Sequence, residues 1–214
     1  MKRVGVVVHP TRDVLDALEV LERWTLERGL ELVQVAAGEK PSVAPPGEVS
    51  DCDLVVALGG DGTILKALHA SARTQTPVLG VACGSLGALT TLPPIELAVG
   101  LARFAAGDWR ARHLSALAVD AAGGRIASAI NDLVLARGKR NQLLLDVCVD
   151  GDLYVRLAGD GIVVATPLGS SAYSMAAGGS LIAAGTEGFV CTPLAMHGGC
   201  APPLVVREGT EVTL

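Results

Sequence analysis

The chain has 214 residues, of which 50% are hydrophobic and 18% charged, so it can hold one large domain or two small ones with a substantial core. Its formal net charge of −5 and aromatic content of 3% disfavour a nucleic-acid-binding protein, which normally shows a basic face and rings that stack on bases. Gly, Pro or charged residues interrupt the apolar stretches before they reach the about 20 residues of a membrane-spanning helix, and the first residues lack a secretion-signal cleavage site. We therefore expect a cytoplasmic protein with neither a nucleic acid nor a membrane as partner.

The first half of the chain alternates between strand and helix patterns. Continuous apolar runs are typical of parallel strands covered on both faces, and apolar residues at helical spacing predict the intervening helices. The strands are expected at residues 4–8, 32–35, 54–58 and 77–81, and the helices at residues 13–28, 63–72 and 95–104. This order predicts a Rossmann-like α/β domain over residues 1–108, with ligands beyond the carboxyl ends of its strands.

Shorter apolar segments follow, separated by turn residues. They lie at residues 114–119, 125–130, 133–135, 143–149 and 153–157. The pair Asp150-Gly151 between the last two segments is a strong signal for a tight hairpin. Closely spaced short strands predict an antiparallel, all-β domain over residues 109–214.

The five cysteines are widely scattered and form no C-x-x-C pair: they are Cys52, Cys83, Cys148, Cys191 and Cys200. This pattern indicates neither a zinc site nor a disulfide framework. His197 and Cys200 have a spacing that suits metal ligands, but the sequence offers no further partners for a metal. We expect ordinary thiols in a reducing compartment and no dedicated metal site.

The first unusual stretch is the turn Gly59–Thr63, which follows the third expected strand. Its three glycines suit a backbone that a phosphate approaches closely at a strand-to-helix turn. Because a carboxylate repels phosphate, Asp61 needs another role: to accept a proton or hydrogen bond from a substrate hydroxyl, or to hold Mg²⁺. The alternative is a tight turn with a local hydrogen bond to Asp61. Lys66, about one helical turn later, is either a phosphate-binding residue or a solvated helix lysine.

The second unusual stretch runs from Asp160 to Gly179, where a strand leads into small residues around Tyr173. Small side chains let a flat ligand approach the backbone, the serines offer hydroxyl groups, and the tyrosine ring offers a face for a purine. The alternative is a closely packed strand-to-helix junction with Tyr173 in the core and the serines as helix caps. The occurrence of both unusual stretches in one chain favours the binding function.

These motifs resemble those of the NAD kinases, in the same order and at similar spacing. The matching residues are Gly59–Thr63, Asn131-Asp132, Asp160-Gly161, Thr166-Pro167, Ser171–Ser174 and Gly178-Gly179. The first motif also occurs in diacylglycerol and sphingosine kinases, whereas the later stretch is much more specific to NAD kinases. The resemblance covers nearly the whole chain, as far as Pro203–Val205.

The resemblance implies transfer of a phosphoryl group from ATP, or from inorganic polyphosphate, to the 2′-hydroxyl of the adenosine ribose of NAD, with Mg²⁺ or another divalent metal. It implies an α/β domain followed by a β domain with NAD between them, and a homodimer or homotetramer in which a neighbouring subunit helps to complete the site. Asp61 is then the expected proton acceptor. The residues expected to bind substrates are Gly60, Gly62 and Thr63 at the phosphates, Asn131 and Asp132 at the adenosine end of NAD, Asp160 at its nicotinamide end, and Ser171, Ala172 and Tyr173 around adenine and ribose, together with Ser174 and Ala176.

The sequence departs from the usual family pattern at several positions. Ala82 replaces a usual Asn, Ala88 a usual Phe, Leu168 a small hydroxyl residue, Ser171 a usual Thr and Pro202 a usual Arg. These departures concern the contacts to adenine and to the nicotinamide end. Family members usually continue through further strands beyond the position of Leu214, so we expect a trimmed member, or a β domain that closes differently or with help from a partner.

Two functions from different classes therefore compete. An NAD kinase produces NADP, whereas a non-catalytic regulatory module binds NAD or NADP without turnover. Asp61 favours the kinase, because binding alone does not require a carboxylate at that turn. A third function, a lipid kinase, is disfavoured by the stretch Ser171–Tyr173 and by the lack of a basic amphipathic segment.

Overall fold

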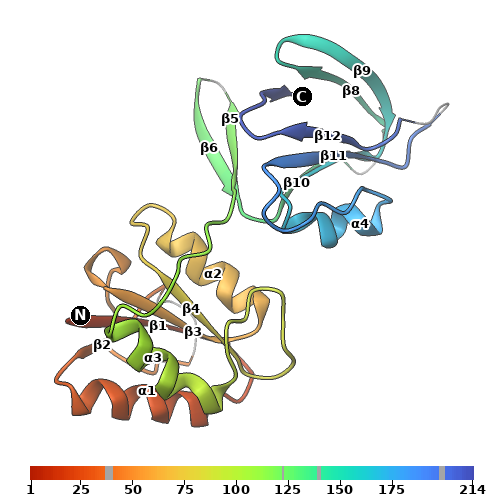
Figure 1. The fold of residues 1–214 in the computed structure, drawn as a ribbon. Helices are drawn as coiled ribbons and strands as arrows, with labels where there is room; N and C mark the ends of the chain where they lie inside the picture. The colour runs from red at the N-terminus through yellow and green to blue at the C-terminus, as the bar shows by residue number, and fades with distance from the viewer. Residues whose placement is uncertain (37–40, 122, 139–140, 198–200) are drawn as a thin grey trace. The chain divides into compact units, whose positions relative to one another are not determined.

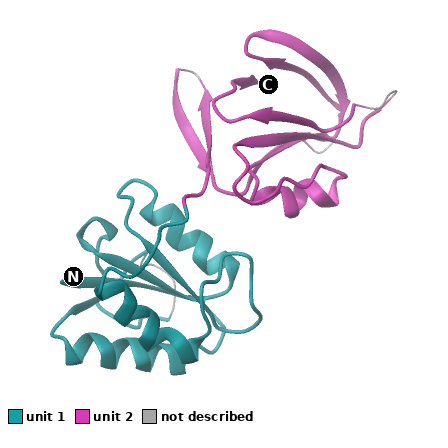
Figure 2. Cartoon of the chain, viewed as in Figure 1, with its two compact units in different colours: residues 1–112 teal, residues 113–214 magenta. Residues whose placement is uncertain are grey.

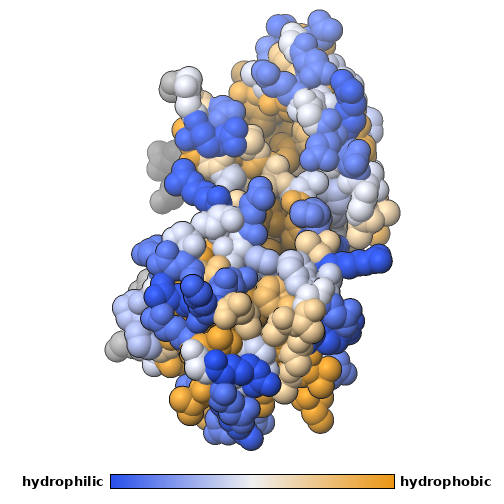
Figure 3. Space-filling model, turned by 60° about the vertical axis from the view of Figure 1, so that its left-hand side comes forward, coloured by the Kyte–Doolittle hydropathy of each residue, from blue (hydrophilic) through white to orange (hydrophobic). Residues whose placement is uncertain are grey.

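A computed structural model describes residues 1–36, 41–121, 123–138, 141–197 and 201–214; Cys200 lies outside these ranges. The chain forms two compact units, Met1–Arg112 and His113–Leu214, each with its own hydrophobic core clusters (Figure 2). On the face shown in Figure 3, hydrophilic residues are interspersed with hydrophobic ones. In the described part of the chain, no helix combines the length and apolarity needed to cross a membrane.

The first unit is a parallel sheet with helices on both faces, as predicted (Figure 1). In chain order its elements are β1 (Arg3–Val8), α1 (Leu15–Glu27), β2 (Glu31–Gln34), the 3-10 turn η1 (Val49–Asp51), β3 (Leu54–Gly59), α2 (Asp61–Ser71), β4 (Val78–Ala82), the 3-10 turn η2 (Pro94–Glu96) and α3 (Leu97–Ala105). The strand order is β2-β1-β3-β4, and every neighbouring pair is parallel. The carboxyl ends of β1, β3 and β4 therefore lie next to one another at one edge of the sheet.

The two faces of this sheet carry separate cores. On one face, residues of α1 and α3 share a core with alternate residues of β1 and β3; Leu21, Leu101 and Val6 are members of this core. On the other face, α2 packs through Ile64 and Ala67. Because side chains alternate along a strand, a run such as Leu54–Leu58 supplies both cores, which explains why it is apolar throughout.

The second unit consists of antiparallel β-structure, again as predicted. Its elements are β5 (Leu117–Ala121), β6 (Gly124–Ala129), β7 (Asp132–Ala136), β8 (Leu143–Val149), β9 (Asp152–Gly159), β10 (Gly161–Ala165), the 3-10 turn η3 (Gly169–Ser171), α4 (Tyr173–Ala176), β11 (Gly188–Leu194), β12 (Leu204–Arg207) and β13 (Val212–Thr213). The sheets have the orders β12-β11-β10-β7 and β13-β8-β9, and β5 pairs with β6. The first strand begins three residues later than expected, because its pairing with β6 starts at Leu117.

The expected hairpin lies between β8 and β9. Asp150 has φ of 49° and Gly151 has φ of 91°, so both turn residues adopt the left-handed conformation. Two consecutive residues of this kind match the twist of the flanking strands, and Asp-Gly is a favoured pair for such a turn. The local sequence signal and the structure therefore agree at this position.

Candidate active site

The turn Gly59–Thr63 places a carboxylate at the carboxyl edge of the parallel sheet. β3 ends at Gly59 and α2 begins at Asp61, with Gly60 as the residue that precedes the helix. A Cβ on Gly59 would collide with the Thr63 hydroxyl, so the glycine permits α2 to start this close to β3. Among the described residues no side chain caps the helix, and its N-terminus faces the sheet edge where ligands are expected.

The carboxylate of Asp61 is held by backbone amides from the segment that follows β4. Its Oδ2 accepts a hydrogen bond from the N–H of Ala88 and its Oδ1 from the N–H of Leu89, both at 3.0 Å. A Cβ on Gly87 would overlap the carboxylate, so the glycine makes room for this approach. Since each carboxylate oxygen can accept a second hydrogen bond, Asp61 keeps acceptor capacity for a substrate hydroxyl.

Asp61 lies in the lining of a cavity of about 220 Å³ within the first unit. It is lined by Val8, His9, Pro10, Arg12, Gly60, Asp61, Gly62, Thr63 and Lys66. All the site residues predicted in this unit therefore meet in one place, although the Thr63 side chain is largely buried against Gly59.

Two basic lining residues, His9 and Arg12, escaped the sequence analysis. They follow β1, whose carboxyl end lies beside that of β3. Ligands bind at the carboxyl ends of parallel strands, and this rule holds for the first expected strand as well as for the third. It could therefore have identified His9 and Arg12 from the sequence.

In the second unit, the turn after β10 rests directly on Asn131. The N–H of Thr166 donates to the Asn131 carbonyl at 2.9 Å, and the Thr166 hydroxyl donates to the Ile130 carbonyl at 2.6 Å. A Cβ on Gly169 would collide with the Asn131 backbone. The Asn131-Asp132 and Thr166-Pro167 motifs, which lie 35 positions apart in the sequence, are thus parts of one packed junction.

Two acceptor side chains sit at this junction. The Oδ1 atom of Asn131 is buried and has no hydrogen-bond partner among the described residues. Burial also raises the pKa of the Asp132 carboxyl group above its usual value. A buried acceptor without a donor is uncommon in a folded protein.

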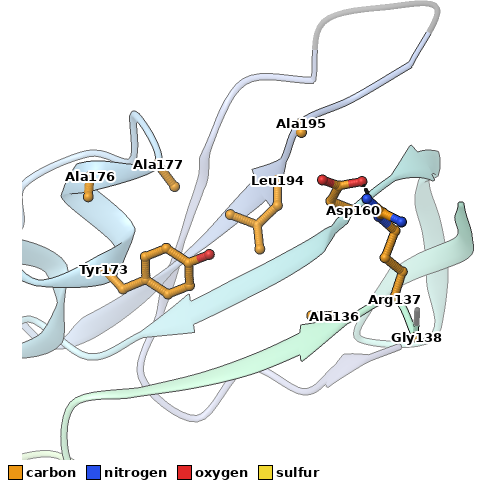
Figure 4. Close-up of a pocket in the computed structure, with 9 residues that line it drawn as sticks. All are labelled: Ala136, Arg137, Gly138, Asp160, Tyr173, Ala176, Ala177, Leu194 and Ala195. Carbon is orange, nitrogen blue, oxygen red and sulfur yellow. Dashed lines mark hydrogen bonds and ion pairs between the residues drawn. The ribbon is translucent and has the colours of Figure 1, made fainter. Parts of the chain in front are cut away.

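A second cavity, of about 680 Å³, lies along the ends of β7, β10 and β11 next to α4 (Figure 4). It is lined by Ala136, Arg137, Gly138, Asp160, Tyr173, Ala176, Ala177, Leu194 and Ala195. Three predicted site residues, Asp160, Tyr173 and Ala176, meet here. The Tyr173 side chain is about half exposed, and its ring points toward Leu194 in Figure 4.

Arg137 is a lining residue that the sequence analysis did not single out. Its Nε donates to Oδ1 of Asp160 at 2.5 Å, and its backbone N–H donates to the Asp160 carbonyl at 2.8 Å. Ala136 and Gly161 are paired in the β7–β10 ladder, and Arg137 follows Ala136 while Asp160 precedes Gly161. Nothing in the local sequence around Arg137 signals this partner, because the register of two strands sets it.

The other predicted binding residues of the second unit differ in how far they are exposed to solvent. Ser171 and Ala172 are exposed, and the Ser171 hydroxyl donates to the Leu168 carbonyl at 3.1 Å. Ser174 is fully buried, and its Oγ lies 2.8 Å from Oγ1 of Thr192. Its hydroxyl therefore already has a partner within the fold, on β11.

The fold and the cavity of the first unit suit a phosphotransferase that acts on a hydroxyl group. The lining of one cavity in the parallel unit includes an aspartate, glycines and basic residues. Phosphoryl transfer to a hydroxyl requires a proton acceptor and groups that bind phosphate, and these residue types can supply both.

Comparison with known proteins gives the particular family. Residues 39–109 match the ATP-NAD kinase N-terminal domain, and residues 130–214 match the ATP-NAD kinase C-terminal domain. The NAD kinase of Pseudomonas fluorescens (strain SBW25) is 35% identical over 228 residues, covering 100% of this chain and 76% of that protein. The NAD kinase of Methanothermobacter thermautotrophicus is 34% identical over 221 residues, covering 99% and 77%. The chain belongs to the NAD kinase family.

Solved structures support the same fold. An NAD kinase from Archaeoglobus fulgidus, solved in complex with ATP, matches with a TM-score of 0.77 and 27% identity over 98% of this chain and 79% of that one. Yeast NADH kinase, solved with NADH, matches with a TM-score of 0.79 and 23% identity over 99% and 71%. The second comparison bears on the fold alone.

Proposed function

We propose that this protein is an NAD kinase that transfers a phosphoryl group from ATP, or from inorganic polyphosphate, to the 2′-hydroxyl of the adenosine ribose of NAD. One observation carries the proposal: Asp61 lines a cavity together with His9, Arg12 and Lys66, and two backbone amides orient its carboxylate. The relatives named NAD kinase, which align over almost the whole chain, support it.

Asp61 is the proposed proton acceptor. As the ribose oxygen forms its bond to the γ-phosphorus, the bond from that phosphorus to the oxygen bridging the β- and γ-phosphates breaks, and ADP leaves. The hydroxyl proton passes to the carboxylate. A ribose hydroxyl is a poor nucleophile at neutral pH, so a carboxylate within hydrogen-bond reach is the expected aid.

NAD contacts are proposed for the second unit. Asn131 and Asp132 contact the adenosine end, as the family resemblance implies. Ser171, Ala172 and Tyr173 contact adenine and ribose, and Asp160 contacts the nicotinamide end. Asp160, Tyr173 and Ala176 line one cavity, which supports their grouping.

A divalent metal is proposed to reach the site with the donor. Among the described residues, no three His, Cys, Asp or Glu side chains converge as a metal-binding group. Mg²⁺ fits such a site, because it commonly binds through substrate phosphates and only one or two protein carboxylates, and Asp61 can serve as one. When bound, Mg²⁺ neutralises phosphate charge. We further propose a homodimer or homotetramer, as the family resemblance implies.

The test is an NADP assay on the purified protein with Mg²⁺ and NAD, run in parallel with ATP and with inorganic polyphosphate. We expect NADP with at least one donor. Repeating the assay with NADH compares the two acceptors. NAD or NADP binding in calorimetry without turnover on any donor would instead establish a regulatory binding module and overturn the proposal.

A further inference from the structure

The segment after β1 holds Arg12 in a defined place. The Nδ1 atom of His9 accepts hydrogen bonds from the backbone N–H groups of Thr11, at 3.2 Å, and Arg12, at 3.0 Å. The backbone N–H of His9 donates to the Leu58 carbonyl of β3 at 2.9 Å. The chain between His9 and Arg12 is therefore folded around the imidazole and tied to the strand that leads into the catalytic turn.

Space for the Arg12 guanidinium is provided by two glycines. A Cβ on Gly60 would lie 3.1 Å from its Nη1 atom, and a Cβ on Gly84 would lie 2.9 Å from it. Gly84 also has φ of +130°, a conformation that favours glycine. The Nη1 atom lies 3.4 Å from the Cys83 carbonyl, to which it donates. The guanidinium thus reaches across the carboxyl ends of β1, β3 and β4.

No carboxylate of the described residues lies within ion-pair distance of this guanidinium. Within the ranges that the structure describes, Arg12 forms no ion pair, although it lines the same cavity as Asp61. Lys66 and the uncapped N-terminus of α2 border that cavity as well. An unpaired guanidinium beside a helix N-terminus favours an anion with several oxygens, such as a phosphate chain.

We propose that Arg12 binds the terminal phosphates of the phosphoryl donor and neutralises charge on the group being transferred. This assignment rests on the proposed kinase function. The described lining of the cavity includes no Phe, Tyr or Trp on which a base could stack. The cavity therefore recognises the phosphate chain rather than the nucleoside, and Arg12 serves ATP and inorganic polyphosphate alike.

The test compares Arg12→Gln, Arg12→Lys and a control, Arg23→Gln, which removes the same charge from an exposed position on α1. We expect kcat/KM for ATP to fall by about 100-fold in Arg12→Gln, the usual effect of losing one preorganised donor to developing charge. Arg12→Lys should recover only part of this loss, because it cannot bind two phosphate oxygens in the same way. KM for NAD and the midpoint of thermal unfolding should stay close to the Arg23→Gln values.

A second readout is binding of tripolyphosphate with Mg²⁺, measured by calorimetry at low and high salt. We expect weaker, less salt-dependent binding in Arg12→Gln than in Arg23→Gln. Equal ATP kinetics and equal tripolyphosphate affinity in the two variants would overturn the role, and so would a fall in thermal stability with tripolyphosphate affinity unchanged. If the unmodified protein makes no NADP, the kinase proposal fails, while the tripolyphosphate comparison still decides whether Arg12 binds phosphate.

Discussion

Asp61 and Leu89 are joined by a 3.0 Å hydrogen bond from the backbone N–H of Leu89 to the Asp61 carboxylate, across 28 positions of sequence. The neighbouring amide of Ala88 binds the other carboxylate oxygen. Because the donors are main-chain groups, these two hydrogen bonds to Asp61 do not depend on which side chain occupies position 88. The unusual alanine there therefore leaves the orientation of the proposed catalytic carboxylate intact.

Asp61→Asn is expected to reduce kcat by about 100-fold or more, because the amide cannot take the proton of the ribose hydroxyl. The dissociation constant for NAD should change little, since most proposed NAD contacts lie elsewhere. Steady-state NADP formation and calorimetry measure the two quantities. Asp16→Asn, an exposed change on α1, controls for loss of negative charge. Unchanged turnover in Asp61→Asn would reassign the carboxylate to a purely structural role.

Gly87→Ala tests the placement of Asp61 without changing its chemistry. The added methyl group would overlap the carboxylate, which must then move. We expect kcat to fall by about 10- to 100-fold, because small displacements of a catalytic group are costly. The matched control is Gly124→Ala, where an added Cβ meets no atom within 4 Å and φ is not in the left-handed region. Full activity in Gly87→Ala would show that the carboxylate does not need this orientation.

Tyr173 is the aromatic residue of the larger cavity, and about half of its side chain is exposed. If the ring stacks on adenine, Tyr173→Ala should raise the NAD dissociation constant by about 5- to 50-fold. Tyr173→Phe keeps the ring and should retain most of the affinity. Calorimetric titration with NAD, alongside thermal unfolding of each variant, separates binding from folding. A drop in unfolding temperature without any loss of NAD affinity would place the ring in the core instead.

Local sequence patterns predicted the elements whose residue types directly reflect burial or turn conformation. The run Leu54–Leu58 is apolar because both faces of β3 are buried, and Asp150-Gly151 adopts the hairpin turn that its residue types favour. β11 was harder to predict, because Pro193 lies inside it and proline is rare within sheets. The strand tolerates this proline since β12 pairs with β11 only from Gly188 to Cys191.

The contacts that complete the sites could not be predicted in the same way, because they join residues far apart in the chain. Arg12 and the Cys83 carbonyl are separated by 71 positions, and Arg137 and Asp160 by 23. Which side chains meet is set by strand order and register, not by local pattern. The same reason explains Ser174, whose hydroxyl resembles a ligand-binding group in the sequence but bonds to Thr192 in the fold.

The last prediction concerns Asp53, which ties the start of β1 to β3. Its Oδ2 atom accepts hydrogen bonds from the backbone N–H groups of Lys2, at 2.5 Å, and Arg3, at 3.0 Å. These two bonds stabilise the charged carboxylate and hold the pKa of Asp53 below its usual value of 3.8. A carboxyl group with a lower pKa in the folded state stabilises the fold above the unfolded pKa. That contribution is lost as the pH falls through the lower, folded value.

Asp53→Asn should therefore lower the unfolding temperature at pH 7. The difference in unfolding temperature between the variant and the unmodified protein should shrink as the pH falls below about 4. The asparagine oxygen still accepts a hydrogen bond. A difference in unfolding temperature that does not change with pH therefore comes from replacing the carboxylate by a neutral amide, and only the pH-dependent part of the difference reports the carboxylate charge. Thermal unfolding followed by circular dichroism between pH 2 and pH 7 measures this difference in unfolding temperature. Asp16→Asn is the control for a generic loss of charge. A difference that stays constant over this range would mean that the Lys2 and Arg3 amides do not stabilise the Asp53 carboxylate in solution.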